Sequence, residues 1–374
     1  MKESKSTIYF ENLDGLRFLC FLLVFLRHSL HTENIAILES PIYKFIKFQV
    51  FGSGTLGVNF FFVLSGYLIT YLLIEEKNNF GKINIKNFWT RRALRIWPLY
   101  FTCVFIGFVV FPLIKEYFSQ TSNESAHLLS YLTFTHNFDV ILNGNPDSSI
   151  LATLWTIAIE EQFYFIWPIL LAFVPIKKYW IIFTTVIAGS LFYRATHDNH
   201  YLHKLHTFSC MGDLAVGAFG AWAICYYGKF KIMIKTLKAS TLIVLYTITA
   251  VCYFFYNDIF GTNFLTRVFS NLVLSILFII IILEQCYTEK SLFKMVNNKI
   301  FSRLGKISYG LYCLHSIGIL IILTITAKWN LSLTGILLIH LPISLLLSIG
   351  LSILSYHYLE KPFLRLKERF RKSE

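Results

Sequence analysis

The chain has 374 residues, of which 55% are hydrophobic and only 15% are charged, whereas soluble domains carry roughly 25% charged residues. Apolar runs that approach the roughly 20 residues needed to span a bilayer recur along the chain, which excludes an ordinary soluble fold. The net charge of +13 does not indicate a nucleic-acid partner, because the basic residues lie in short stretches between the apolar runs. The seven cysteines form no CxxC pair and are typical of small buried hydrophobes.

The hydropathy pattern predicts an all-α polytopic membrane helix bundle of about ten transmembrane helices. The expected spans are residues 13–31, 55–74, 96–114, 150–174, 179–193, 207–227, 239–256, 266–284, 307–327 and 333–359. The polar connection 115–149 contains a turn signal at Asn143 to Pro146 and is expected to form part of a mouth on one face. We expect a single membrane domain over residues 1–374, with a basic cytoplasmic tail at 360–374.

The distribution of Lys and Arg orients these spans, because basic residues near span ends favour the cytoplasm. With the N-terminus inside, 25 of the 34 Lys and Arg fall in cytoplasmic stretches and only 6 fall outside. An even number of helices, with both termini cytoplasmic, is therefore the predicted topology.

Arg17 lies near the cytoplasmic end of the first expected span, and His28 lies in its outer half. An ionisable group inside a lipid-spanning segment costs at least a few kcal/mol, so it needs a partner, a water-filled cavity or a function. The two residues are 11 positions apart, which at about 100° per residue puts them on one helix face, roughly 16 Å apart. An arginine at one membrane interface and a histidine near the other explain the pattern equally well.

A basic stretch at 91–95 lies just before the third expected span. Its Arg92 and Arg95 are one helical turn apart, so they are able to present two guanidinium groups to a phosphate-bearing ligand. Such stretches are also common anchors at cytoplasmic helix ends, and taken alone this one favours anchoring.

Two adjacent carboxylates, Glu160 and Glu161, lie well inside an apolar span. Adjacent helical residues point about 100° apart, so at most one of them faces a given cavity. Their position favours function over structure.

Tyr309 and His315 belong to the start of the ninth span, where packing and interhelical hydrogen bonding are an equal explanation. A further stretch carries histidines at a spacing of three (His197, His200, His203, His206). No paired carboxylates accompany these histidines, so we expect no metal site there.

Six segments in order resemble the motifs of acyltransferase family 3, a family of membrane O-acyltransferases that modify surface polysaccharides, lipopolysaccharide, peptidoglycan and some small molecules. The resemblance covers nearly the whole chain. It rests on LDGLRFLCFLLVFLRH (13–28), GVNFFFVLSGYLIT (57–70), RRALRIWPLY (91–100), LWTIAIEEQFYFIWP (154–168), LGKISYGLYCLH (304–315) and YHYLEKPFLRL (356–366). Two positions depart from the family: Arg27 is often aromatic, and Ile317 is often proline. Some members carry a C-terminal extracytoplasmic hydrolase-like domain, which is not expected here.

The resemblance implies His28 as the catalytic histidine, Arg17 as its helix partner, Arg92 and Arg95 as acyl-CoA contacts, and Glu160 as an essential carboxylate. It implies a multi-pass protein of the bacterial inner or plasma membrane, with the lipid bilayer and a carbohydrate or lipid-linked glycan as its partners.

The residues and the resemblance agree on one mechanism, in which an acyl group, expected to be acetyl, moves from cytosolic acyl-CoA to a glycan hydroxyl. His28 acts as general base, Glu160 orients or polarises the site and Tyr309 assists. Direct transfer and an acyl-enzyme route both fit. The alternative is a secondary transporter, because buried Arg, His and Glu also build ion relays. We find neither repeat symmetry nor paired broken spans, and their absence counts against a transporter.

The orientation predicts where reporter fusions will lie. A reporter fused after Glu374 should be cytoplasmic, and reporters inserted near Asn143 and His200 should be external, because most basic residues then face the cytoplasm. An external reporter after Glu374 would contradict the orientation.

Overall fold

A computed structural model describes residues 10–52, 54–261 and 263–370. Within these residues the chain is helical and has no strand, so the predicted all-α membrane bundle is confirmed. The α-helices are α1 (Glu11–Ser29), α2 (Ile35–Glu39), α3 (Pro41–Lys44), α4 (Gly54–Phe80), α5 (Ile85–Phe105), α6 (Phe111–Tyr117), α7 (Leu128–Leu132), α8 (His136–Asn143), α9 (Ser149–Thr153), α10 (Trp155–Phe173), α11 (Tyr179–Thr196), α12 (His200–Leu205), α13 (Thr207–Tyr226), α14 (Gly228–Lys235), α15 (Ala239–Phe254), α16 (Tyr256–Phe260), α17 (Phe264–Tyr287), α18 (Lys299–Gly305), α19 (Ser308–Thr326), α20 (Leu333–Gly335), α21 (Leu341–Ser355) and α22 (Lys361–Lys367). The helical structure also includes short 3-10 turns, η3 (Ile176–Lys178), η4 (Met295–Asn297), η5 (Ala327–Trp329) and η8 (Glu368–Phe370). It includes π-helical turns as well, η1 (Phe45–Val50), η2 (Ile106–Val110), η6 (Ile336–His340) and η7 (Tyr356–Glu360).

Each of the ten expected spans falls on a helix of the structure. Among the described residues, seven helices are long and apolar enough to cross a membrane, and the bent pair α14 and α15, with 88° between its members, makes up to eight. The helices outside this set include α1, which carries four charged residues, and α11, which ends in Arg194 and Thr196. The multi-pass architecture is therefore established, and the total of ten stays a prediction.

The third span begins earlier than the sequence pattern predicted. Asn84 caps α5 by accepting a hydrogen bond from the backbone N–H of Asn87 at 3.0 Å, and the helix runs from Ile85 through η2 and α6 to Tyr117. Arg92 and Arg95 therefore lie inside a continuous helix, two to three turns beyond its start, rather than in a connection ahead of it. The helix therefore extends well ahead of the expected span start at residue 96, because Asn84 caps it within the polar segment.

Helices α4 and α13 pack closely through two glycines. A Cβ atom on Gly66 would overlap the carbonyl oxygen of Leu214, and one on Gly217 would overlap that of Val63. Small residues allow this approach of two helix backbones, which dispersion then stabilises in an apolar medium. This pair forms the centre against which α1, α10, α11 and α17 pack.

A cluster of apolar side chains joins α1 to α19. Phe21 and Phe25 are completely buried and pack with Leu311 and Ile319 of α19. The phenylalanines are four residues apart, so they occupy one face of α1. This interface fixes the position of α1 relative to α19, which carries His315.

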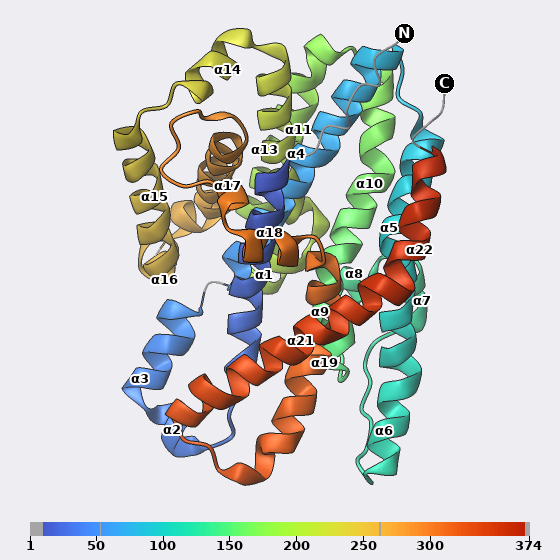
Figure 1. Ribbon diagram of the computed structural model, residues 1–374, viewed down its shortest axis with the longest axis vertical. Helices are drawn as coiled ribbons and strands as arrows, with labels where there is room; N and C mark the ends of the chain where they lie inside the picture. The colour runs from blue at the N-terminus through green and yellow to red at the C-terminus, as the bar shows by residue number, and fades with distance from the viewer. Residues whose placement is uncertain (1–9, 53, 262, 371–374) are drawn as a thin grey trace.

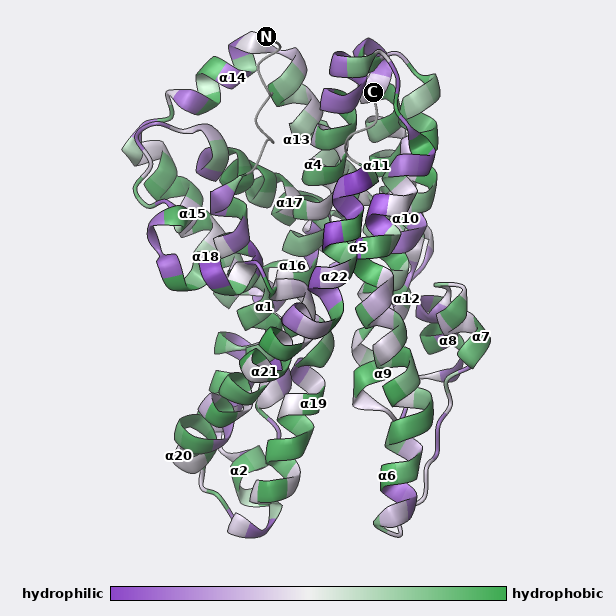
Figure 2. Cartoon of the chain, turned by 45° about the vertical axis from the view of Figure 1, so that its right-hand side comes forward, coloured by the Kyte–Doolittle hydropathy of each residue, from purple (hydrophilic) through white to green (hydrophobic). Residues whose placement is uncertain are grey.

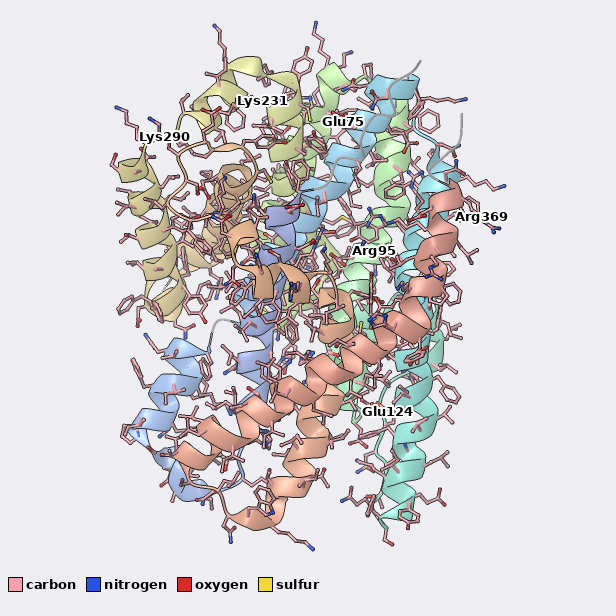
Figure 3. The ribbon with its side chains drawn as sticks, viewed as in Figure 1. Glu75, Arg95, Glu124, Lys231, Lys290 and Arg369 are labelled. Atoms are coloured by element: carbon pink, nitrogen blue, oxygen red, sulfur yellow. The ribbon has the colours of Figure 1, made fainter. Side chains whose placement is uncertain are left out.

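The helices run in both directions between two ends of the molecule (Figure 1). Helix α14 and the α4–α5 turn lie at the upper end, and the α19–α20 turn lies at the lower end. Hydrophobic residues cover most of α6, α9, α19 and α21, while hydrophilic residues occur at mid-height around α5, α10 and α22 (Figure 2). Lys231, Lys290 and Arg369 lie in the upper half, and Glu124 of the 115–149 connection lies in the lower half (Figure 3). The upper end thus carries three of the stretches expected in the cytoplasm.

Candidate functional site

His28 and His315 meet inside the bundle. The Nδ1 atom of His28 lies 2.8 Å from the Nε2 atom of His315, and the Nδ1 atom of His315 lies 2.7 Å from the carbonyl oxygen of Tyr312. His315 is 0% exposed. His28 has a solvent-accessible side chain, although many protein atoms lie around it.

Two cations lie near His28, and one of them comes from a connection between spans. The charges of Lys204 on α12 and of Arg27 both act on His28. The Nζ atom of Lys204 lies 5.8 Å from the ring centre of Trp155, within the range of a cation–π contact. Burial lowers the pKa of Lys204, and Arg27 lowers it further. Positive charge therefore lies near His28, and one of the two cations packs on an aromatic ring.

Arg17 lies on α1 away from this space. It forms an ion pair with Asp14, one turn earlier on the same helix. Gly305 of α18 packs on the backbone of Asp14, where a Cβ atom would overlap the carbonyl oxygen. The expected spacing from His28 is kept, because 11 residues of helix rise about 16 Å. Asp14, the partner of Arg17, is thus part of the contact between α1 and α18.

Arg92 and Glu160 belong to a second cluster, closer to the upper end. The guanidinium of Arg92 lies over the rings of Phe88 and Tyr164, 5.6 and 5.5 Å from their centres. The charges of Arg92 and Glu160 act on each other. Tyr164 and Ser65 share a hydrogen bond of 2.6 Å beside them. The cluster therefore joins α4, α5 and α10.

Arg95 lies between two carboxylates. Its charge acts on Glu160 of α10 and on Glu360 of η7, and Glu360 accepts a hydrogen bond from Ser355 at 3.2 Å. Arg95 lies toward the middle of the molecule, below the level of Lys231 and well inside the surface lysines (Figure 3). This placement differs from that of a simple interface anchor.

The two adjacent carboxylates point in different directions, as their spacing predicted. Glu161 accepts a hydrogen bond from the indole N–H of Trp97 at 3.0 Å, and its other oxygen is buried with no partner among the described residues. Glu160 faces both arginines of the second cluster. The geometry favours Glu160 as the carboxylate that acts with Arg92 and Arg95.

Helix α19 connects the two clusters. Tyr309 donates a hydrogen bond to the carbonyl oxygen of Ile96 at 2.7 Å, next to Arg95. One turn later Tyr312 accepts a hydrogen bond from Thr156 of α10 at 2.7 Å, and His315 follows one turn beyond. The hydroxyl of Tyr309 is thus bonded to α5, two helical turns along α19 from His315.

In the histidine-rich segment, described side chains stack on an aromatic ring or contact the backbone. The rings of His197 and His206 stack on Tyr193, with centres 4.1 and 4.3 Å from it, and His203 contacts the carbonyl oxygen of His197. Across the part of the chain that the structure describes, no group of three or more His, Cys, Asp or Glu side chains is placed to hold a metal ion.

Sequence reasoning missed three of these residues as parts of the site. His315 was noted within a motif, but its contact with His28 joins positions 287 residues apart. Lys204 lies in a connection with no motif. Glu360 had a signal, because it lies in the last of the six motifs, one residue beyond the expected end of the last span.

Comparison with known proteins places the chain in a family. The family model described as "Acyltransferase domain", of acyltransferase family 3, matches residues 10–357. The chain is 26% identical to "Putative peptidoglycan O-acetyltransferase YrhL" of Bacillus subtilis, covering 95% of this chain and 55% of that protein. It is 27% identical to "Putative O-acetyltransferase SACOL0978" of Staphylococcus aureus, covering 96% and 58%.

A shorter match, 32% identical over 179 residues, covers 46% of this chain and 26% of "O-acetyltransferase OatA" of Staphylococcus aureus. The chain thus spans little more than half the length of the first two relatives. No solved structure matches it significantly. Because the family match extends over nearly the whole sequence, the chain belongs to acyltransferase family 3.

Proposed function

We propose that this protein is a membrane O-acyltransferase that moves an acetyl group from cytosolic acetyl-CoA to a hydroxyl of a cell-envelope glycan. The observation that carries the proposal is the accessible imidazole of His28, which is held by a second histidine inside a bundle that also contains two arginines. The names of the relatives support an O-acetyltransferase, and one of those names includes peptidoglycan. A bacterial plasma membrane is the location that fits such an acceptor.

The donor side of the proposal rests on Arg92 and Arg95. Both guanidinium groups are half-buried, and among the described residues neither donates a hydrogen bond. Arginine recognises phosphate oxygens through paired, charge-assisted hydrogen bonds, which makes these groups suitable contacts for the phosphates of CoA. Glu160 and Glu360 balance the two charges until the donor binds.

The chemical step rests on His28. The Nε2 atom of His28 takes the proton of the acceptor hydroxyl while the hydroxyl oxygen attacks the thioester carbonyl carbon. The carbon–sulfur bond then breaks, and the thiolate of CoA takes the proton from the imidazolium. A positioned base of this kind contributes about 10²- to 10⁴-fold in rate.

Two residues expected at the site take supporting positions in this proposal. Tyr309 donates its hydroxyl proton to Ile96 and so fixes α19 against the helix that carries Arg95. Arg17 is paired with Asp14, whose backbone packs against Gly305 of α18. Loss of either residue therefore acts through the placement of the reacting groups.

Removing both donor-site arginines should weaken the binding of acetyl-CoA. We expect the Arg92→Ala, Arg95→Ala variant to bind it about 10- to 100-fold more weakly, because charge-assisted hydrogen bonds to phosphate are lost. Isothermal titration of the detergent-purified protein measures this. Arg91→Ala is the matched control, because Arg91 pairs with Glu76 at 2.8 Å. Equal affinity of the double variant and the wild type for acetyl-CoA would contradict the donor site and indicate that both arginines act only as topology anchors.

Replacing His28 should abolish chemistry and leave donor binding intact. We expect His28→Ala to transfer labelled acetyl groups to glycan acceptors about 10²- to 10⁴-fold more slowly. His31→Ala serves as control, because His31 is exposed beyond the end of α1. A folded His28→Ala protein with wild-type transfer would exclude His28 as the base.

Tyr309→Phe tests the supporting position of that residue. Losing the hydroxyl leaves the buried carbonyl of Ile96 without this donor, so we expect the free energy of unfolding to fall by about 1–3 kcal/mol. The rate per folded molecule should change little. Tyr358→Phe is the control, since Tyr358 is 81% exposed. A rate loss of 100-fold at unchanged thermal stability would instead give Tyr309 a part in the chemistry.

A further inference from the structure

The hydrogen bonds of His315 determine which of its nitrogens carries a proton. Its Nδ1 atom lies 2.7 Å from the carbonyl oxygen of Tyr312, and a carbonyl oxygen only accepts, so Nδ1 is the protonated nitrogen. In a neutral imidazole the other nitrogen is then an acceptor. The Nε2 atom of His315 therefore accepts a hydrogen bond.

The same reasoning extends to His28. Its Nδ1 atom is 2.8 Å from Nε2 of His315, so Nδ1 of His28 carries the hydrogen that is donated. The Nε2 atom of His28 is left with its lone pair and makes no hydrogen bond to the described residues. In the opposite tautomer of His28, two lone pairs would face each other at this distance, and a hydrogen bond within the protein would be lost.

The ring geometry agrees with this direction of donation. The two imidazole planes differ by 8° and their centres are 5.2 Å apart. Two nitrogens 2.8 Å apart are too close for rings that lie face to face, so the imidazoles meet edge to edge in nearly one plane. In that arrangement the N–H bond of His28 points along the lone pair of His315.

The surroundings hold His315 in place. Its ring is completely buried and meets the edges of Phe21 and Phe25, with centres 5.8 and 6.4 Å away. These phenylalanines precede His28 on the same face of α1, at spacings of seven and three residues. The α1–α19 interface that packs the bundle thus also orients the pair of histidines.

We propose that His315 is a positioning residue that fixes the tautomer and direction of His28, so that the Nε2 lone pair of His28 points away from His315 and is free to accept a proton. The chain of hydrogen bonds runs from His28 Nδ1–H to His315 Nε2 and from His315 Nδ1–H to the carbonyl oxygen of Tyr312. When His28 takes a proton from the acceptor, the bond to neutral His315 persists and stabilises the imidazolium. Arg27 and Lys204, which also face His28, oppose that charge. The proposal rests on the proposed role of His28 as the base.

The test compares two amides at position 315. The side-chain oxygen of glutamine reaches the position of imidazole Nε2 and is able to accept from His28, whereas asparagine is shorter and reaches only the position of Nδ1. We expect His315→Asn to lower kcat about 10- to 100-fold, as for the loss of an orienting hydrogen bond to a functional histidine. His315→Gln should recover most of the rate. Acetyl-CoA affinity should be unchanged in both variants.

The measurement is the transfer of labelled acetyl from acetyl-CoA to soluble peptidoglycan fragments as a function of pH, normalised to folded protein by size-exclusion chromatography. A purely structural role predicts that Asn and Gln lower kcat equally or in proportion to their melting temperatures, and that result would overturn the proposal. Wild-type kcat in His315→Asn would overturn it too. A fully active His28→Ala protein would instead overturn the proposed base, which separates the two failures.

Discussion

A hydrogen bond between two histidines from distant parts of the chain sets the geometry around which the candidate site is built. His28 is near the C-terminal end of α1 and His315 is in the middle of α19, and the phenylalanines that pack these helices together also contact the ring of His315. An ionisable group inside a membrane bundle is costly unless it is paired or faces water. His315 meets the requirement with two hydrogen bonds, and His28 meets it with one hydrogen bond and an accessible ring.

The same constraint explains the second cluster. Arg92 and Arg95 lie inside a long helix rather than at its margin, and Glu160 and Glu360 supply the opposite charges from α10 and η7. Both arginine residues are partly buried among these carboxylates. Helix α19 spans the distance between the clusters, because the six residues from Tyr309 to His315 rise about 9 Å.

The sequence was sufficient for the bundle and for much of the candidate site, because both leave local signals. Apolar runs located the spans, and the spacing of Arg17 and His28 follows from one helix. Contacts between helices leave no such signal, so the pairing of His28 with His315 and the approach of Lys204 were not predictable. Helix α5 begins before the expected span, because hydropathy does not detect a helix that continues into polar sequence. The motif that contains Tyr309 was the basis for expecting it to assist the reaction. The hydrogen bond from its hydroxyl to the carbonyl oxygen of Ile96 is a contact between helices that the motif did not predict.

The central claim is that donor and acceptor reach one site from opposite sides of the membrane, and sided proteoliposomes test it most directly. Vesicles with a defined protein orientation would receive labelled acetyl-CoA on one side and peptidoglycan fragments on the other. The account predicts transfer only when acetyl-CoA is on the side that carries Lys231 and Arg369 and the acceptor is opposite. Transfer with acetyl-CoA confined to the other side, or with both substrates required on one side, would contradict it.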